Sequence, residues 1–138
     1  MEVKQTQGDL GTERALLSSI CQLGDEAYYE SADIIDIEAF TNESNQAIFK
    51  CIHDIVEDKN KVDIPTLIAK AEQLNLTRLV CKEKTDIEYI KALFQFPVKF
   101  DNIRNHAKKL GKLQLIRNAK KKHLQAIQDL DGLDGPRS

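Results

Sequence analysis

The last quarter of the chain predicts one long helix. Between Val98 and Leu130 the sequence has no proline and a single glycine, Gly111. A helix of about 30 residues is roughly 45 Å long, whereas a compact chain of this size has a radius of gyration of about 14 Å. We therefore expect the helix to project and its apolar face to need a partner. Its apolar residues follow the spacing of three and four that is typical of an amphipathic helix: Ile103, Ala107, Leu110, Leu113, Ile116, Leu124 and Ile127.

The composition fits a single soluble domain. Of the 138 residues, 41% are apolar and 30% are charged. No apolar run approaches the roughly 18 residues that a membrane-spanning helix needs, and residues 1–9 lack the apolar core of a signal peptide. The three cysteines, an odd number without a C-x-x-C pair, favour reduced thiols. These features predict a cytoplasmic protein that does not associate with membranes.

Charge is divided unevenly along the chain. Residues 1–98 carry 10 basic and 18 acidic side chains, a net charge of −8, whereas residues 99–123 carry 9 basic and 1 acidic, a net charge of +8. An acidic body is therefore expected to bear a basic arm. The residues considered for contact with nucleic acid or with an acidic partner are Lys108, Lys109, Lys112, Lys120, Lys121 and Lys122.

Three interpretations of this basic arm are open. Its lysines can form a solvated helix face, pair with an acidic surface on another copy or a partner, or follow a phosphate backbone. The aligned apolar positions favour helix pairing, because phosphate contacts do not require them. Residues 101–130 also lack Phe, Tyr and Trp, on which bases could stack. The residues expected to meet a second copy or a partner are Ile103, Leu110, Leu113, Ile116, Arg117, Leu124 and Ile127.

The sequence before this segment predicts further helices, because β-branched alternation is nearly absent. Thr12 is expected to cap a first helix that ends at Leu23, with Gly24 as its stop. The segment Thr85–Glu88 fits a capping box that opens a helix through Phe94. The other expected elements are a helix over 25–33, a turn over 36–40, a core helix over 42–58 and a helix with Pro65 in its first turn.

The expected architecture is all-α, with a small helical globule followed by a long projecting helix. Phe96-Pro97 separates the two, because the residue before a proline disfavours helix. The predicted boundaries are a flexible N-terminus at 1–10, the globule at 11–97, the long basic amphipathic helix at 98–130, and a flexible tail or expression remnant at 131–138.

No residue pattern indicates a catalytic, cofactor or metal site in this segment. Cys51 and His53 are two positions apart and so point to different sides of a helix, while a structural zinc ion needs about four convergent ligands. No G-x-x-x-x-G-K-[ST] motif is present, and Gly111-Lys112 lacks the second glycine of a phosphate-binding loop. We therefore expect these residues to have no enzyme activity.

Four segments of the sequence have residue patterns that can be compared with a known protein family. They are ERALLSSI (Glu13–Ile20), EAFTNESNQAIFKCI (Glu38–Ile52), VDIPTL (Val62–Leu67) and IEYIKALFQFPVKFDNIRNHAKKLGKLQLIRNA (Ile87–Ala119). Their order and spacing resemble the N-terminal domain of DnaB-type replicative DNA helicases over about residues 11–130. The matching positions are Phe40, Ile48, Phe49, Asp63, Leu67, Tyr89, Leu93, Asn102, Ile103, Ala107 and Arg117.

The resemblance implies a helical globule followed by a helical hairpin. In the family, these hairpins pair between neighbouring subunits, and the domains form a collar above a hexameric ring of ATPase domains. The collar takes part in docking primase and, in some members, the helicase loader. The domain itself has no catalytic site, so ATP and Mg²⁺ are expected only for a motor domain. The expected location is the cytoplasm of a bacterial cell or a phage-infected host.

The sequence departs from the family pattern in two ways. It lacks the phosphate-binding loop of the motor, and it stops near the point where the hairpin should turn, so the long helix corresponds to the first arm alone. We therefore expect a fragment of a larger helicase or a stand-alone relative. Two alternatives are a stand-alone replisome adaptor, which resembles the collar or a primase's helicase-binding region, and a basic-helix nucleic-acid-binding module. DNA contact by this segment is expected to be weak or absent.

Overall fold

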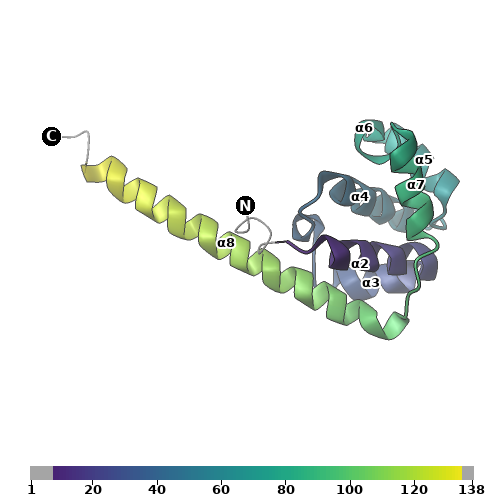
Figure 1. Cartoon of the computed structure of the whole chain (residues 1–138), viewed down its shortest axis with the longest axis horizontal. Coiled ribbons are helices and arrows are strands. Elements are labelled where there is room, and N and C mark those ends of the chain that lie inside the picture. The colour runs from purple at the N-terminus through teal and green to yellow at the C-terminus, as the bar shows by residue number, and fades with distance from the viewer. Residues whose placement is uncertain (1–7, 135–138) are drawn as a thin grey trace.

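The structure, a computed structural model, describes residues 8–134, and these form helices joined by short connections (Figure 1). Within that range no strand occurs, which confirms the predicted all-α class. Two short 3₁₀ turns are η1 (Ile37–Ala39) and η2 (Phe100–Asn102). The described α-helices are α2 (Leu10–Leu23), α3 (Asp25–Ala32), α4 (Glu43–Glu57), α5 (Ile64–Gln73), α6 (Thr77–Val80), α7 (Lys84–Leu93) and α8 (Ile103–Asp134).

Helix α2 begins earlier than the sequence predicted. Its N-cap is Asp9, whose carboxylate accepts a hydrogen bond from the amide of Thr12 at 3.0 Å. The prediction that Thr12 caps this helix is therefore wrong, because an aspartate three residues earlier takes that role. Gly24 follows the helix as predicted, and its φ of 84° lies in a region that favours glycine.

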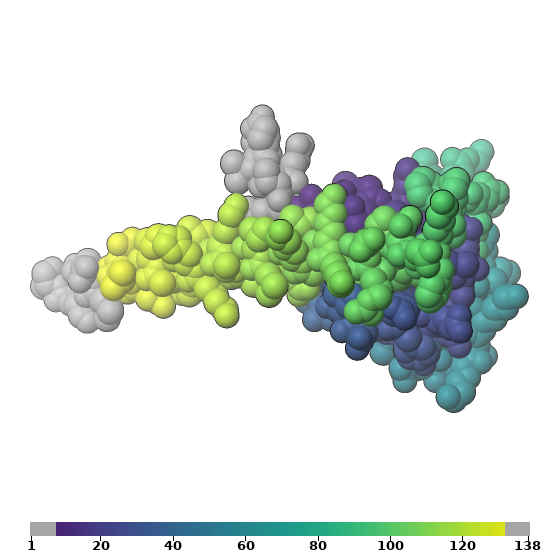
Figure 2. All heavy atoms as spheres, turned by 90° about the horizontal axis from the view of Figure 1, so that it is seen from below, coloured from purple at the N-terminus to yellow at the C-terminus, as the bar shows by residue number. Residues whose placement is uncertain are grey.

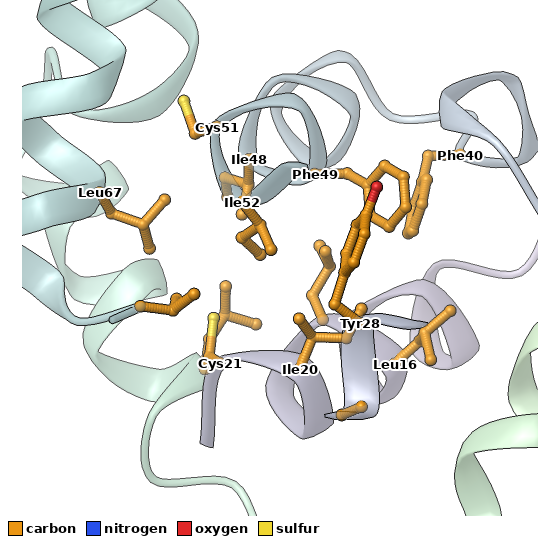
Figure 3. Close-up of a cluster of buried hydrophobic side chains, with 14 of the residues drawn as sticks. Leu16, Ile20, Cys21, Tyr28, Phe40, Ile48, Phe49, Cys51, Ile52 and Leu67 are labelled. Carbon is orange, nitrogen blue, oxygen red and sulfur yellow. The ribbon is translucent and has the colours of Figure 1, made fainter. Parts of the chain in front are cut away.

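Helix α4 confirms the core helix predicted over residues 42–58. Asn42 caps it by accepting a hydrogen bond from the amide of Asn45. The helix packs on α2, α5 and α6. Figure 3 shows Ile48 and Ile52 of α4 pointing toward Ile20 of α2, and all three side chains are fully buried. These side chains form the part of the core that lies between α2 and α4.

Aromatic side chains extend this core toward η1 (Figure 3). The ring centroids of Tyr28 and Phe49 are 5.6 Å apart, and those of Phe40 and Phe49 are 4.9 Å apart. The hydroxyl of Tyr28 forms a hydrogen bond with Nδ1 of His53 at 2.6 Å, so the buried tyrosine keeps its polar atom satisfied. Phe40 thereby ties the end of η1 to α4.

The segment from α5 to α7 differs from the prediction in two places. Asp63 caps α5 and Pro65 lies in its first turn, as the sequence indicated. Helix α6 was not predicted, because a single helical turn carries too little periodicity to be recognised. The capping box predicted at Thr85 is wrong: the cap lies two residues earlier, where Glu83 and Asp86 form the box and Lys84 is the first helical residue.

A buried carboxylate joins α2 to the start of α4. Glu13 accepts hydrogen bonds from the amide and the hydroxyl of Thr41 at 2.9 and 2.6 Å, and from Nδ2 of Asn45 at 2.9 Å. Asn45 in turn accepts a hydrogen bond from the hydroxyl of Tyr89, which adds α7 to the network. These donors and the positive end of the α4 dipole compensate the buried charge.

The long helix differs from its predicted boundaries. It begins at Ile103 rather than Val98, because η2 precedes it, and it continues to Asp134. Residues 131–134, predicted as flexible tail, are therefore helical, and Leu10 belongs to α2 rather than to a flexible N-terminus. The other residues of both predicted termini, apart from 8 and 9, lie outside the described range. The first part of α8 packs on α2 and α3, and the rest leaves the body (Figures 1 and 2).

Gly111 lies where α8 passes the connection that follows α3. A Cβ at this position would lie 3.6 Å from Cγ2 of Ile35 and 3.7 Å from Cγ2 of Ile34, which are ordinary contact distances. The passage of α8 over this connection therefore tolerates glycine but does not require it.

The variants Gly111→Ala and Gly24→Ala are expected to change the free energy of unfolding in opposite directions. Alanine at 111 reduces the entropy of the unfolded chain and should stabilise the fold by about 0.5–1 kcal/mol. Alanine at 24 must adopt a positive φ and should destabilise it by about 1–3 kcal/mol. Urea unfolding followed by circular dichroism measures both. A destabilised Gly111→Ala chain would contradict the placement of α8 over Ile34 and Ile35.

The ion pair between Asp9 and Lys109, at 2.6 Å, predicts an acid-sensitive attachment of α8. The hydrogen bond from Lys109, with that from the Thr12 amide, lowers the pKa of Asp9 from 3.8 to about 2. Because the folded pKa lies below the unfolded one, this stabilisation is present above about pH 4 and is lost as the pH falls toward 2. Lys109→Ala should raise the pKa of Asp9, as measured by NMR titration. An unchanged pKa in that variant would show that the pair is not formed.

Candidate interaction surface

The apolar positions of α8 fall into two groups with different surroundings. Ile103, Ala107 and Leu110 are fully buried against the body of the same chain, where α8 packs on α2 and α3. The prediction that Ile103 and Leu110 meet a second copy is therefore wrong, because α8 leaves the body only after these residues. The sequence could not separate the groups, since both follow helical spacing.

The final contacts between α8 and the body are polar. Nε2 of Gln114 donates to Oδ1 of Asp36 at 3.3 Å, and Nη2 of Arg117 donates to the carbonyl of Glu38 at 2.8 Å. Arg117, predicted at the partner interface, thus contacts its own chain near η1. Beyond it, every side chain in residues 118–131 is exposed. We call this exposed segment the distal arm.

Leu113 and Ile116 mark the transition into the distal arm. Leu113 is half-buried and Ile116 is exposed. The side chain of Leu113 is therefore partly covered by the body, whereas that of Ile116 lies in solvent. Within the arm, Leu124 is 59% exposed, Ile127 43% and Leu130 59%. Each residue of an α-helix is rotated by about 100° from the one before it. The apolar side chains from Leu113 to Leu130 therefore lie on a side of α8 that is about a third of a turn away from the side that carries the buried group.

Polar residues replace the buried apolar group where α8 leaves the body. The helix side that carries Ile103, Ala107 and Leu110 continues as Gln114, Lys121, Gln125 and Gln128. The apolar side of the arm is therefore a separate surface and not an extension of the core. Sequence reasoning missed Leu130, which continues that surface, and Leu115, which is exposed on another side of the helix.

The lysines of α8 do not form one row. Lys109 pairs with Asp9, whereas Lys108 and Lys112 make no ion pair within residues 8–134. Residues 120, 121 and 122 follow one another, so their lysine side chains point in directions about 100° apart. Such a distribution does not match the single line of phosphates along one nucleic-acid strand.

The described residues hold no arrangement typical of a metal or catalytic site. Residues 8–134 hold no group of three or more His, Cys, Asp or Glu side chains that could bind a metal ion. Burial raises the pKa of the Cys21 and Cys51 thiols to about 12 each, so both behave as small apolar core side chains at neutral pH. Nor does any helix in this range combine the length and apolar character that a membrane crossing requires.

The fold is similar to a helicase domain of known structure. The family model described as DnaB-like helicase N terminal domain matches residues 5–112. The crystal structure of the N-terminal domain of DnaB helicase from Mycobacterium tuberculosis superposes with a TM-score of 0.76 and 18% sequence identity, over 88% of this chain and 84% of that chain. No curated protein sequence gives a significant match. Because the family model covers most of its length, the chain belongs to the DnaB-like helicase N-terminal domain family.

Proposed function

We propose that this chain is the collar domain of a replicative DNA helicase. In this role it supports subunit assembly and docks primase or a helicase loader, and it does not itself catalyse a reaction. Membership of the DnaB-like N-terminal family supports the helicase context. ATP and Mg²⁺ would be bound by a separate motor domain, and the protein would act in the cytoplasm of a bacterial cell or a phage-infected host.

The exposed apolar side of the distal arm carries this proposal. Leu124, Ile127 and Leu130 lie in solvent on the distal arm, where every side chain of residues 118–131 is exposed. Burying each of them against a partner would contribute up to roughly 1.5–3 kcal/mol, whereas an exposed ion pair contributes about 0.2–1 kcal/mol. Helix pairing is therefore the interaction that this arm favours. The proposed first partner is a second copy, as a dimer within a hexamer of the parent protein.

Contact between this arm and DNA is proposed to be weak or absent. Its lysines spread around the helix, and residues 101–131 contain no Phe, Tyr or Trp on which bases could stack. The body next to the arm carries a net charge of −8, which repels a phosphate backbone.

The double variant Leu124→Asp/Ile127→Asp tests the proposal. It places two charges where pairing would have to bury them, so self-association should weaken at least about tenfold while the body stays folded. Sedimentation velocity over a concentration series, in about 500 mM NaCl to screen repulsion between lysines, measures the association. Circular dichroism melting measures the stability of the body.

The matched control is Asn118→Asp/Ala126→Asp, which adds the same charge on the opposite side of the arm. This control should leave the association unchanged, whereas Leu110→Asp should unfold the body, because Leu110 is buried in it. Equal weakening by both double variants, or a monomeric wild-type chain in this series, would contradict the proposal. Sub-micromolar binding to single-stranded DNA at about 150 mM salt would favour the nucleic-acid-binding function instead.

A further inference from the structure

An open hollow lies between α3 and the start of α8. Its volume is about 750 Å³, and the side chains around it include Glu26, Tyr29, Glu30, Asp33, Phe100 and Arg104. The two helices contact each other beside it. Figure 2 shows the face on which the green start of α8 lies against the blue residues of the body.

The hollow carries more negative than positive charge. Nη1 of Arg104 donates to Oε1 of Glu30 at 3.2 Å and lies 4.0 Å from Oδ2 of Asp33. Glu26 is exposed and lies outside the ion pairs that Arg104 makes with Glu30 and Asp33. Three carboxylates and one guanidinium thus line the hollow. The hollow already holds one cationic side chain and retains negative charge for another.

Two aromatic rings are exposed beside these carboxylates. Tyr29 is 53% exposed and Phe100 is 42% exposed. Aromatic faces attract cations and also pack against the aliphatic stems of lysine side chains. An acidic hollow with exposed rings therefore fits a partner that presents lysine side chains, whose stems can pack on the rings.

The distal arm has this chemistry but cannot reach the hollow of its own chain. Lys121 and Lys122 lie outside the apolar side of the arm, and neither makes an ion pair with the described residues. Roughly 25 Å of continuous helix separates Arg104 from these lysines, at 1.5 Å per residue. Figure 1 shows the arm leading away from the body. A surface that neutralises these lysines must therefore belong to another molecule.

We propose that Lys121 and Lys122 of the distal arm of one copy dock in the acidic hollow of a second copy. The run of lysines at 120–122 on the arm and the net charge of −8 on residues 1–98 support an occupant from the same chain. The contact joins two different patches and is therefore heterologous. It uses a different surface from the apolar side of the arm and goes beyond the function proposed above. Exposed ion pairs are screened by salt, so this association fades at high ionic strength.

Two charge-reversal variants of the full chain test this contact. The hollow variant is Glu26→Lys/Asp33→Lys, and the arm variant is Lys121→Glu/Lys122→Glu. Sedimentation velocity in about 50 mM and about 500 mM NaCl compares them with the wild type. The wild-type chain should associate at least about fivefold more tightly at the lower salt. Each variant alone should lose this difference.

A mixture of the two variants gives the sharpest comparison. In the mixture, the basic arm of the hollow variant is complementary in charge to the acidic hollow of the arm variant. The acidic arm of the arm variant is likewise complementary to the basic hollow of the hollow variant. The mixture should therefore recover the salt-sensitive association that neither variant shows alone. The control variant Glu72→Lys/Glu88→Lys changes two exposed carboxylates elsewhere on the body and should behave like the wild type. Circular dichroism melting verifies that each variant is folded.

Three outcomes would overturn the proposal: variants that keep the salt-sensitive association, a mixture that does not recover it, or a wild-type chain that does not show it. The two salt conditions separate this contact from helix pairing. Association that persists at high salt and depends on Leu124 and Ile127 reports the apolar side of the arm. The additional association at low salt, which depends on Glu26 and Lys122, reports the hollow.

Discussion

The arrangement of the molecule depends on one apolar contact, in which Ile103, Ala107 and Leu110 of α8 pack against α2 and α3. Because α8 is a continuous helix, fixing its first turns also fixes the direction of all later ones (Figure 1). The ion pair between Asp9 and Lys109 reinforces this contact. About two turns of buried helix thus decide where the distal arm points. Damage to this contact would misplace the arm without altering any of its residues.

Negative charge has two different roles in the body. Glu13 is buried, and its hydrogen bonds hold α2, α4 and the connection before α4 in one arrangement. Its contribution is structural, since donors and the α4 dipole surround it. The carboxylates near Arg104 are instead open to solvent, so their charge acts on molecules that approach. The same residue type therefore stabilises the fold in one place and provides an attractive surface in another.

The helices were predictable where apolar spacing and a strong cap coincide, as in α4 and α5. Caps were misplaced where several acceptors lie close together: Asp9 competes with Thr12, and Glu83 competes with Thr85. The division of α8 into buried and exposed groups was not predictable, because helical spacing does not tell where a helix leaves its own body. The hollow could not be predicted for a related reason. Its side chains come from α3 and from the start of α8, about 70 residues later, and the sequence does not show that these two segments pack side by side.

The two apolar groups of α8 lie on different sides of the helix. The number of residues between them therefore fixes the direction in which the second group points, relative to the body. One residue inserted or deleted between Leu110 and Leu113 would leave the first half seated on the body. It would turn the second half by about 100° around the helix axis. The body would fold as before, yet the arm would offer its leucines in a new direction. Homologues can therefore redirect this surface by a change in length alone, with every residue of the surface kept.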